Sequence, residues 1–176
     1  MLVNRIPCLD AGFVAYLDSS GNSNKLKDIA LEFFKKTDGK FLHDISTLTL
    51  VIKCPLFVQL NLSRYALHII STLESEVEAY VPNVGEIGGK DHETNRLISD
   101  DIKRTTEALL INPRAYQTDG CDRFVSQILM PVSTYTTLII HGSCNEWRKF
   151  CTQNNTPASI SSYIDAVKQI MTLEWK

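Results

Sequence analysis

The sequence predicts an α+β fold in which a small antiparallel sheet packs with several helices, including a long buried central helix. Few segments carry the alternating or β-branched pattern of strands, and the helical segments cluster instead of alternating with strands one by one. The chain has 176 residues, 44% of them hydrophobic, which is enough for one substantial core. We therefore expect a single domain over residues 1–176.

The first half of the chain contains two expected strands and two expected helices. An apolar run over residues 11–18, ended by a Ser- and Gly-rich turn, predicts the first strand. Asn24 can cap a helix with apolar residues at helical spacing, and Asp38-Gly39 ends it. Residues 47–53 alternate and are rich in β-branched side chains, so they predict a half-buried strand beside the first. Proline in the first turn and an apolar stripe predict a long helix over 55–73.

The second half begins with a glycine-containing loop over residues 81–90. Residues 93–111 predict an amphipathic helix that Asn112-Pro113 ends. A short helix is expected over 122–129, and a strand over 134–141, which is rich in Thr and Ile. Two more helices are expected, over 145–153 and 157–172. The inward face of the 93–111 helix is expected to carry Leu97, Ile98, Ile102, Thr105 and Ala108.

Composition excludes several classes of function. A net charge of -2 gives no excess of cations to neutralise a nucleic-acid backbone. No apolar run has the length of a membrane span or the pattern of a signal peptide, so we expect a soluble, cytoplasmic protein without a membrane partner. The five cysteines show no common metal spacing, which favours reduced, mostly buried thiols and no metal site.

Two blocks of sequence carry a family resemblance. Ile-Lys-Cys-Pro-Leu-Phe-Val (52–58) opens the long helix after a strand that Phe-Leu-His (41–43) precedes, and Leu-Met-Pro-Val-Ser-Thr-Tyr-Thr (129–136) lies near the end of the chain. In order and spacing, these blocks resemble the flavin-dependent thymidylate synthases (ThyX). The resemblance implies a ThyX-like fold, a homotetramer with sites shared between subunits, and FAD and dUMP as the ligands of an active enzyme.

The catalytic signature of that family is largely replaced in this sequence. The pattern Arg-His-Arg-x-x-Ser-x-Asn-Glu-x-Ser-x-Arg-Tyr would begin at Arg64, where Tyr65 and Ala66 replace the following His-Arg. Asn154 stands where the family has a late arginine. An amide there removes a fixed positive charge and several donors in fork geometry. The resemblance therefore implies that ordinary thymidylate synthesis has been lost.

Five residues are candidates for ligand binding. Asn61 and Arg64, one turn apart on a predicted helix, stand in the places of a family Gln and Arg that touch the nucleotide, although a core amide and a helix-end ion pair would give the same pattern. His43 and Tyr135 match a family His and Tyr, and each could instead be a packing residue. Asn154 is included because of the position it occupies.

Three hypotheses about function follow from these residues. The first is a ThyX-like protein that binds or sequesters a nucleotide or nucleotide-derived molecule at intersubunit pockets, encoded by a phage or another mobile element. The second is an active enzyme that uses FAD and modifies dUMP or another pyrimidine at C5. The third is a non-catalytic scaffold for protein interactions.

Overall fold

The computed structural model describes residues 3–9, 11–20, 46–73, 78–89, 91–120, 130–154 and 156–174. The helix predicted over 24–38, the short helix predicted over 122–129, and His43 lie outside the described residues.

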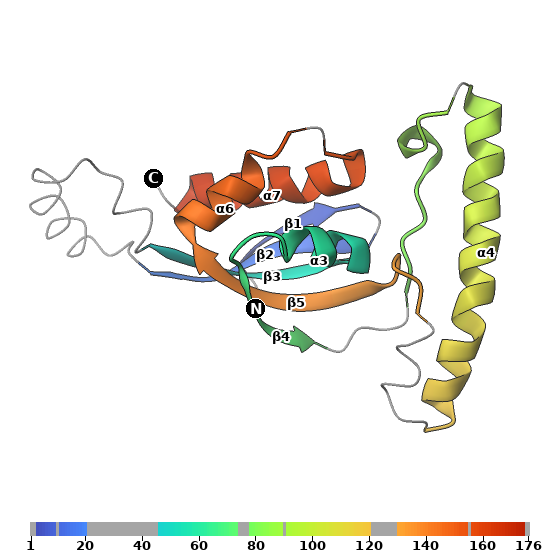
Figure 1. The fold of residues 1–176 in the computed structure, drawn as a ribbon, viewed down its shortest axis with the longest axis horizontal. Coiled ribbons are helices and arrows are strands. Elements are labelled where there is room, and N and C mark those ends of the chain that lie inside the picture. Colours follow the sequence, from blue (N-terminus) through green and yellow to red (C-terminus); the bar gives the residue numbers. More distant parts are fainter. Residues whose placement is uncertain are drawn as a thin grey trace, which may run out of the picture.

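One antiparallel sheet of five strands forms the centre of the molecule (Figure 1). Its spatial order is β1-β2-β3-β5-β4. The strands are β1 (Val3–Cys8), β2 (Gly12–Ser20), β3 (Thr47–Pro55), β4 (His68–Leu73) and β5 (Tyr135–Ser143). The helices are α3 (Leu56–Leu62), the 3-10 turn η1 (Val84–Glu86), α4 (His92–Thr118), α6 (Cys144–Cys151) and α7 (Ala158–Glu174). The α+β class and the small antiparallel sheet are thus confirmed.

The main core lies between one face of the sheet and the helices α6 and α7, which lie together on that face in Figure 1. Alternate residues of β3, namely Leu48, Leu50 and Ile52, are fully buried there, as the period of a half-buried strand requires. Trp147 of α6 is also fully buried, and its indole N–H donates to the carbonyl of Leu48 at 3.0 Å. The predictions of the strands that became β2, β3 and β5, and of the helices that became α6 and α7, are confirmed.

The long buried central helix predicted over 55–73 is wrong. α3 ends at Leu62, and after a turn the chain enters β4, which pairs with β5. The segment His-Ile-Ile-Ser-Thr-Leu (68–73) is rich in β-branched residues, and pairing with β5 gives its backbone hydrogen-bond partners. Apolar spacing alone could not distinguish one long helix from a short helix followed by a strand, because the helical spacing of apolar residues in α3 continues by chance into β4.

The longest helix is α4, and it stands at the margin of the sheet, across the direction of the strands (Figure 1). It runs through Pro113, so the predicted end at Asn112-Pro113 is wrong. Proline removes only one hydrogen bond of the helix, and the ring of Pro113 is buried. The chain leaves the helix near Gly120, whose φ of 71° is the left-handed conformation typical of helix ends.

The face of α4 that we expected to be buried is largely exposed. Leu97 is 58% exposed and Ile98 is 39% exposed, while Thr106 and Leu110 on the opposite side are buried. The expected inward face is therefore wrong for the single chain, and α4 presents apolar side chains away from the body of the molecule.

Candidate functional site

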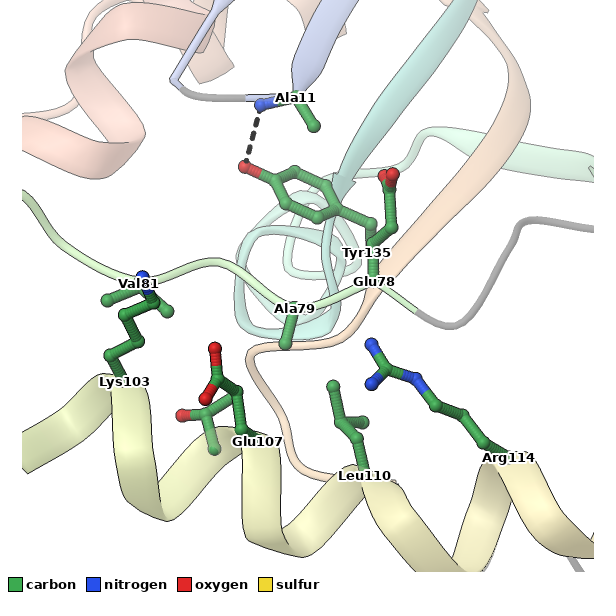
Figure 2. A pocket seen from close by; sticks show the side chains of 10 residues that line it. Ala11, Glu78, Ala79, Val81, Lys103, Glu107, Leu110, Arg114 and Tyr135 are labelled. Carbon is green, nitrogen blue, oxygen red and sulfur yellow. Dashed lines mark hydrogen bonds between the residues drawn. The ribbon is translucent and has the colours of Figure 1, made fainter.

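A pocket of about 400 Å³ lies between α4 and the end of the sheet (Figure 2). Its volume falls within the range of about 300–1,000 Å³ that is usual for sites of small ligands. The residues that line it are Ala11, Glu78, Ala79, Val81, Lys103, Thr106, Glu107, Leu110, Arg114 and Tyr135. It combines charged and aromatic side chains, which is the composition of a site for a polar organic ligand.

One wall of the pocket is a single face of α4. Lys103, Glu107, Leu110 and Arg114 follow one another at steps of four, three and four residues, which brings them onto one side of a helix. Figure 2 shows these side chains rising from the helix toward the opposite wall. The helix therefore presents a cation, a carboxylate, an apolar side chain and a second cation in sequence.

The opposite wall is built by residues 78–81 and by the start of β5. The backbone N–H of Tyr135 donates to the carbonyl of Glu78 at 2.8 Å, and that of Tyr80 donates to the carbonyl of Ser133 at 2.8 Å. The Tyr135 hydroxyl accepts a hydrogen bond from the backbone N–H of Ala11 at 3.4 Å (Figure 2). Tyr135 is thus held by its backbone at one end and by its hydroxyl at the other, and 98% of its surface is buried.

A short ion pair lies at this wall. The Lys53 ammonium is 2.6 Å from a carboxylate oxygen of Glu78, and it lies 5.4 Å from the centre of the Tyr135 ring. The Lys53 side chain is 19% exposed and that of Glu78 is 41% exposed. Glu78 is one of the residues that line the pocket, while the less exposed Lys53 lies behind it and is not one of them.

The loop before α4 holds the two walls together. The Ser99 hydroxyl of α4 donates to the carbonyl of Pro82 at 2.8 Å. Asn83 and Glu86 form a capping box around η1, and the Tyr80 hydroxyl donates to Glu86 at 3.0 Å. The segment predicted as a glycine loop is thus an ordered turn on the side of the pocket.

Of the four predicted site residues that the structure describes, only Tyr135 lines the pocket. Asn61 lies in the last turn of α3 and Arg64 just after the helix, and the backbone N–H of Arg64 donates to the Asn61 carbonyl at 3.2 Å. The Asn61 side-chain oxygen is buried and has no hydrogen-bond partner among the described residues, whereas Arg64 is exposed. Asn154 is exposed after α6, and His43 is not described.

The sequence interpretation missed Lys103, Glu107 and Arg114 as site residues. Lys103 and Glu107 stand four residues apart, a spacing on one helix face that the sequence shows, whereas Arg114 lies beyond the helix end predicted at Asn112-Pro113. We nevertheless expected the polar side of this helix to face solvent, since charged side chains usually do.

The buried thiols are not poised for nucleophilic chemistry. Burial raises the pKa of the Cys8 thiol to about 12 and that of Cys144 to about 11, so both are protonated at neutral pH. The four described cysteines are free and buried, as predicted. Within the described residues, no three His, Cys, Asp or Glu side chains gather as metal ligands, and no helix is long and apolar enough to cross a membrane.

The strand order and the placement of the helices define a ThyX-like α+β fold. The chain is similar to a crystal structure of the UMP/dUMP methylase PolB from Streptomyces cacaoi bound with 5-Br dUMP. The TM-score is 0.70 and the sequence identity is 14%, and the match covers 96% of this chain and 93% of that chain. The sequence itself matches no protein family and no curated protein. The likeness is therefore one of fold.

Proposed function

We propose that this chain is a ThyX-like nucleotide-binding protein, which binds or sequesters a nucleotide or nucleotide-derived molecule at pockets completed by a second copy and has lost thymidylate synthase activity. The observation that carries the proposal is the charged and aromatic pocket beside α4 in a fold shared over 96% of the chain with a methylase bound to 5-Br dUMP.

The chemistry of the pocket suits a mononucleotide. The guanidinium of Arg114 can donate paired hydrogen bonds to phosphate oxygens, and the Lys103 ammonium can add a second positive charge. The partly exposed Ala79 and Val81 offer apolar surface to a base, and the Glu107 carboxylate can accept a hydrogen bond from a base N–H. Each part of the ligand thus has a partner of matching chemistry.

A second copy is the occupant that we propose for the outer side of α4. Residues at steps of four and three form a seam along the helix, in which large apolar side chains alternate with two polar ones, and this is the spacing at which two helices pack together. The seam is formed by Ile98, Ile102, Thr105, Leu109, Asn112 and Tyr116. Leu109 is 52% exposed and Tyr116 is 36% exposed in the single chain. Pairing of this seam with its counterpart buries those side chains and brings a second chain beside the open pocket.

The loss of thymidylate synthase activity is supported by the present roles of the replaced residues. Tyr65 stands where the ThyX resemblance expects a histidine, and its ring packs edge-on against Phe150 with centroids 5.6 Å apart. The backbone N–H of Ala66 donates to Glu146 at 3.2 Å, so this turn is fixed to α6. The signature positions now serve packing, and no cationic side chain remains at 65 or 66.

Isothermal titration calorimetry of the purified protein with dUMP, UMP and 5-Br dUMP tests the proposal. We expect saturable binding of at least one of them, with affinity reduced about tenfold or more by Arg114→Gln, because a charge-assisted paired contact is lost. Arg104→Gln is the matched control, since Arg104 lies on α4 but does not line the pocket. The absence of binding to all three nucleotides, or equal losses in both variants, would refute the proposal.

The second candidate is an active enzyme that modifies a pyrimidine nucleotide at C5, using FAD. It is favoured by one observation, which is that the protein with the similar fold is a methylase of UMP and dUMP. This candidate predicts yellow protein, or reconstitution with FAD, together with release of tritium from C5-labelled dUMP. Our proposal predicts nucleotide binding without tritium release.

A further inference from the structure

The Lys53–Glu78 pair has an unusual position for a surface ion pair. Glu78 and Tyr135 both line the pocket, and the Lys53 ammonium lies 2.6 Å from the first and 5.4 Å from the ring of the second. A ligand that touches either residue therefore comes close to a positive charge that the protein neutralises with its own carboxylate. An ammonium donates hydrogen bonds to carboxylate and phosphate oxygens alike.

We propose that Lys53, beside the pocket, is a further phosphate-binding cation that acts with Arg114, and that the Glu78 carboxylate occupies the place of phosphate oxygens until a ligand displaces it. This inference rests on the proposed nucleotide binding and names the group that the pocket holds through Lys53. Arg114, on the facing wall, then contacts the same phosphate or the sugar beside it.

The exposed fractions of the Glu78 and Lys53 side chains determine which of the two moves away when a ligand binds. The Glu78 side chain is 41% exposed, so its carboxylate can turn into solvent without losing hydration. The Lys53 side chain is 19% exposed and lies over the Tyr135 ring, where a cation is attracted to the aromatic face. The lysine therefore stays in the wall when the carboxylate turns away.

The backbone can remain in place during this exchange. The carbonyl of Glu78 accepts the hydrogen bond from Tyr135, and the next residue, Ala79, bridges Thr134. Figure 2 shows the Glu78 side chain extending along the Tyr135 ring, away from α4. Displacement thus needs only rotation of one side chain.

Titration of the wild type and of Glu78→Gln with dUMP, inorganic phosphate and uridine tests the inference. We expect Glu78→Gln to bind dUMP and phosphate about tenfold more tightly, because the internal competitor is gone, and to bind uridine as the wild type does. Glu78→Ala, a second variant, should likewise bind dUMP and phosphate more tightly than the wild type. Lys53→Gln should weaken phosphate binding about tenfold, and adding Glu78→Gln to it should change little, since Glu78 acts through Lys53.

Asp100→Asn is the matched control, because it removes an exposed carboxylate of α4 that does not line the pocket and leaves the Lys53 pair intact. We expect it to change phosphate affinity less than about threefold. Equal tightening of phosphate binding by the control and by the Glu78 variants would mean a general effect of charge and would overturn the inference, as would unchanged or weaker phosphate binding by the two Glu78 variants.

If phosphate binding tightens as expected and no nucleotide binds any variant, the proposed function fails and the phosphate site stands. If nucleotides bind the wild type and Glu78→Gln does not tighten them, the inference alone fails.

Discussion

Leu109→Ala tests whether the outer seam of α4 joins two copies of the chain. Complete burial of a leucine contributes roughly 1.5–3 kcal/mol, and the 52% of Leu109 that is exposed leaves about half of that for an interface. In a twofold dimer the Leu109 contact occurs twice, and alanine keeps part of the buried apolar surface. We therefore expect a loss of about 1–2 kcal/mol, or a five- to thirtyfold rise in the dimer Kd. Alanine also keeps the helix propensity, so the loss reports the contact.

Sedimentation equilibrium over a dilution series measures this Kd. Leu97→Ala is the control, since Leu97 is 58% exposed and lies about 120° around α4 from Leu109, given about 100° per residue. We expect it to change the Kd less than threefold. Equal weakening by both variants would refute the seam, and so would a wild type that is monomeric at the concentrations where it binds a nucleotide.

Three further predictions concern the core and the replaced signature. Gly12→Ala should lower the melting temperature, because its Cβ would lie 2.6 Å from the Cys8 carbonyl and against the Tyr163 hydroxyl, a clash that typically costs about 1–3 kcal/mol. The unfolding free energy should fall as pH rises from about 9 toward 12. The Cys8 thiol ionises near its ordinary pKa of 9.0 in the unfolded chain, but burial holds it protonated to about 12 in the fold, so its contribution is complete below pH 9 and is lost above it. Urea unfolding between pH 8 and 11 should show a shallower decline in Cys8→Ala. Tyr65→His should destabilise the protein by about 0.5–1.5 kcal/mol in urea unfolding, through loss of the edge-on contact with Phe150, and an unchanged midpoint would count against that role.

The strands that could be predicted are those in which the alternation of apolar and polar residues determines which side chains are buried. In β3, Leu48 and Leu50 face the core and Thr49 between them does not, so alternation and structure agree. β1 was not predicted, because it is a short edge strand that contains Pro7. The conformation of residues 68–73 depends on the free edge of β5, which is a tertiary feature that local spacing does not contain.

The pocket was harder to predict than the sheet for a related reason. α4 carries apolar residues on more than one side, and its sequence does not say which side meets the body of the protein. We assigned the exposed side to the core, which placed Lys103 in solvent, and we ended the helix at Asn112-Pro113, which left Arg114 outside it. Once the side with Thr106 and Leu110 is known to face the sheet, both cations fall into the pocket.

The fold can persist without the ThyX signature because most of the buried core residues lie elsewhere in the chain. The core is built by alternate residues of β3 and β5 and by α6 and α7, and most of these positions lie outside the stretch where the ThyX signature would stand. Replacing the signature could therefore alter the chemistry and leave the core intact. Tyr65 shows the further step, because a position that the resemblance assigns to catalysis now contacts Phe150 of the core. Restoring a histidine there would remove a packing contact without recreating the other missing groups, so the fold of this chain does not by itself determine its reaction.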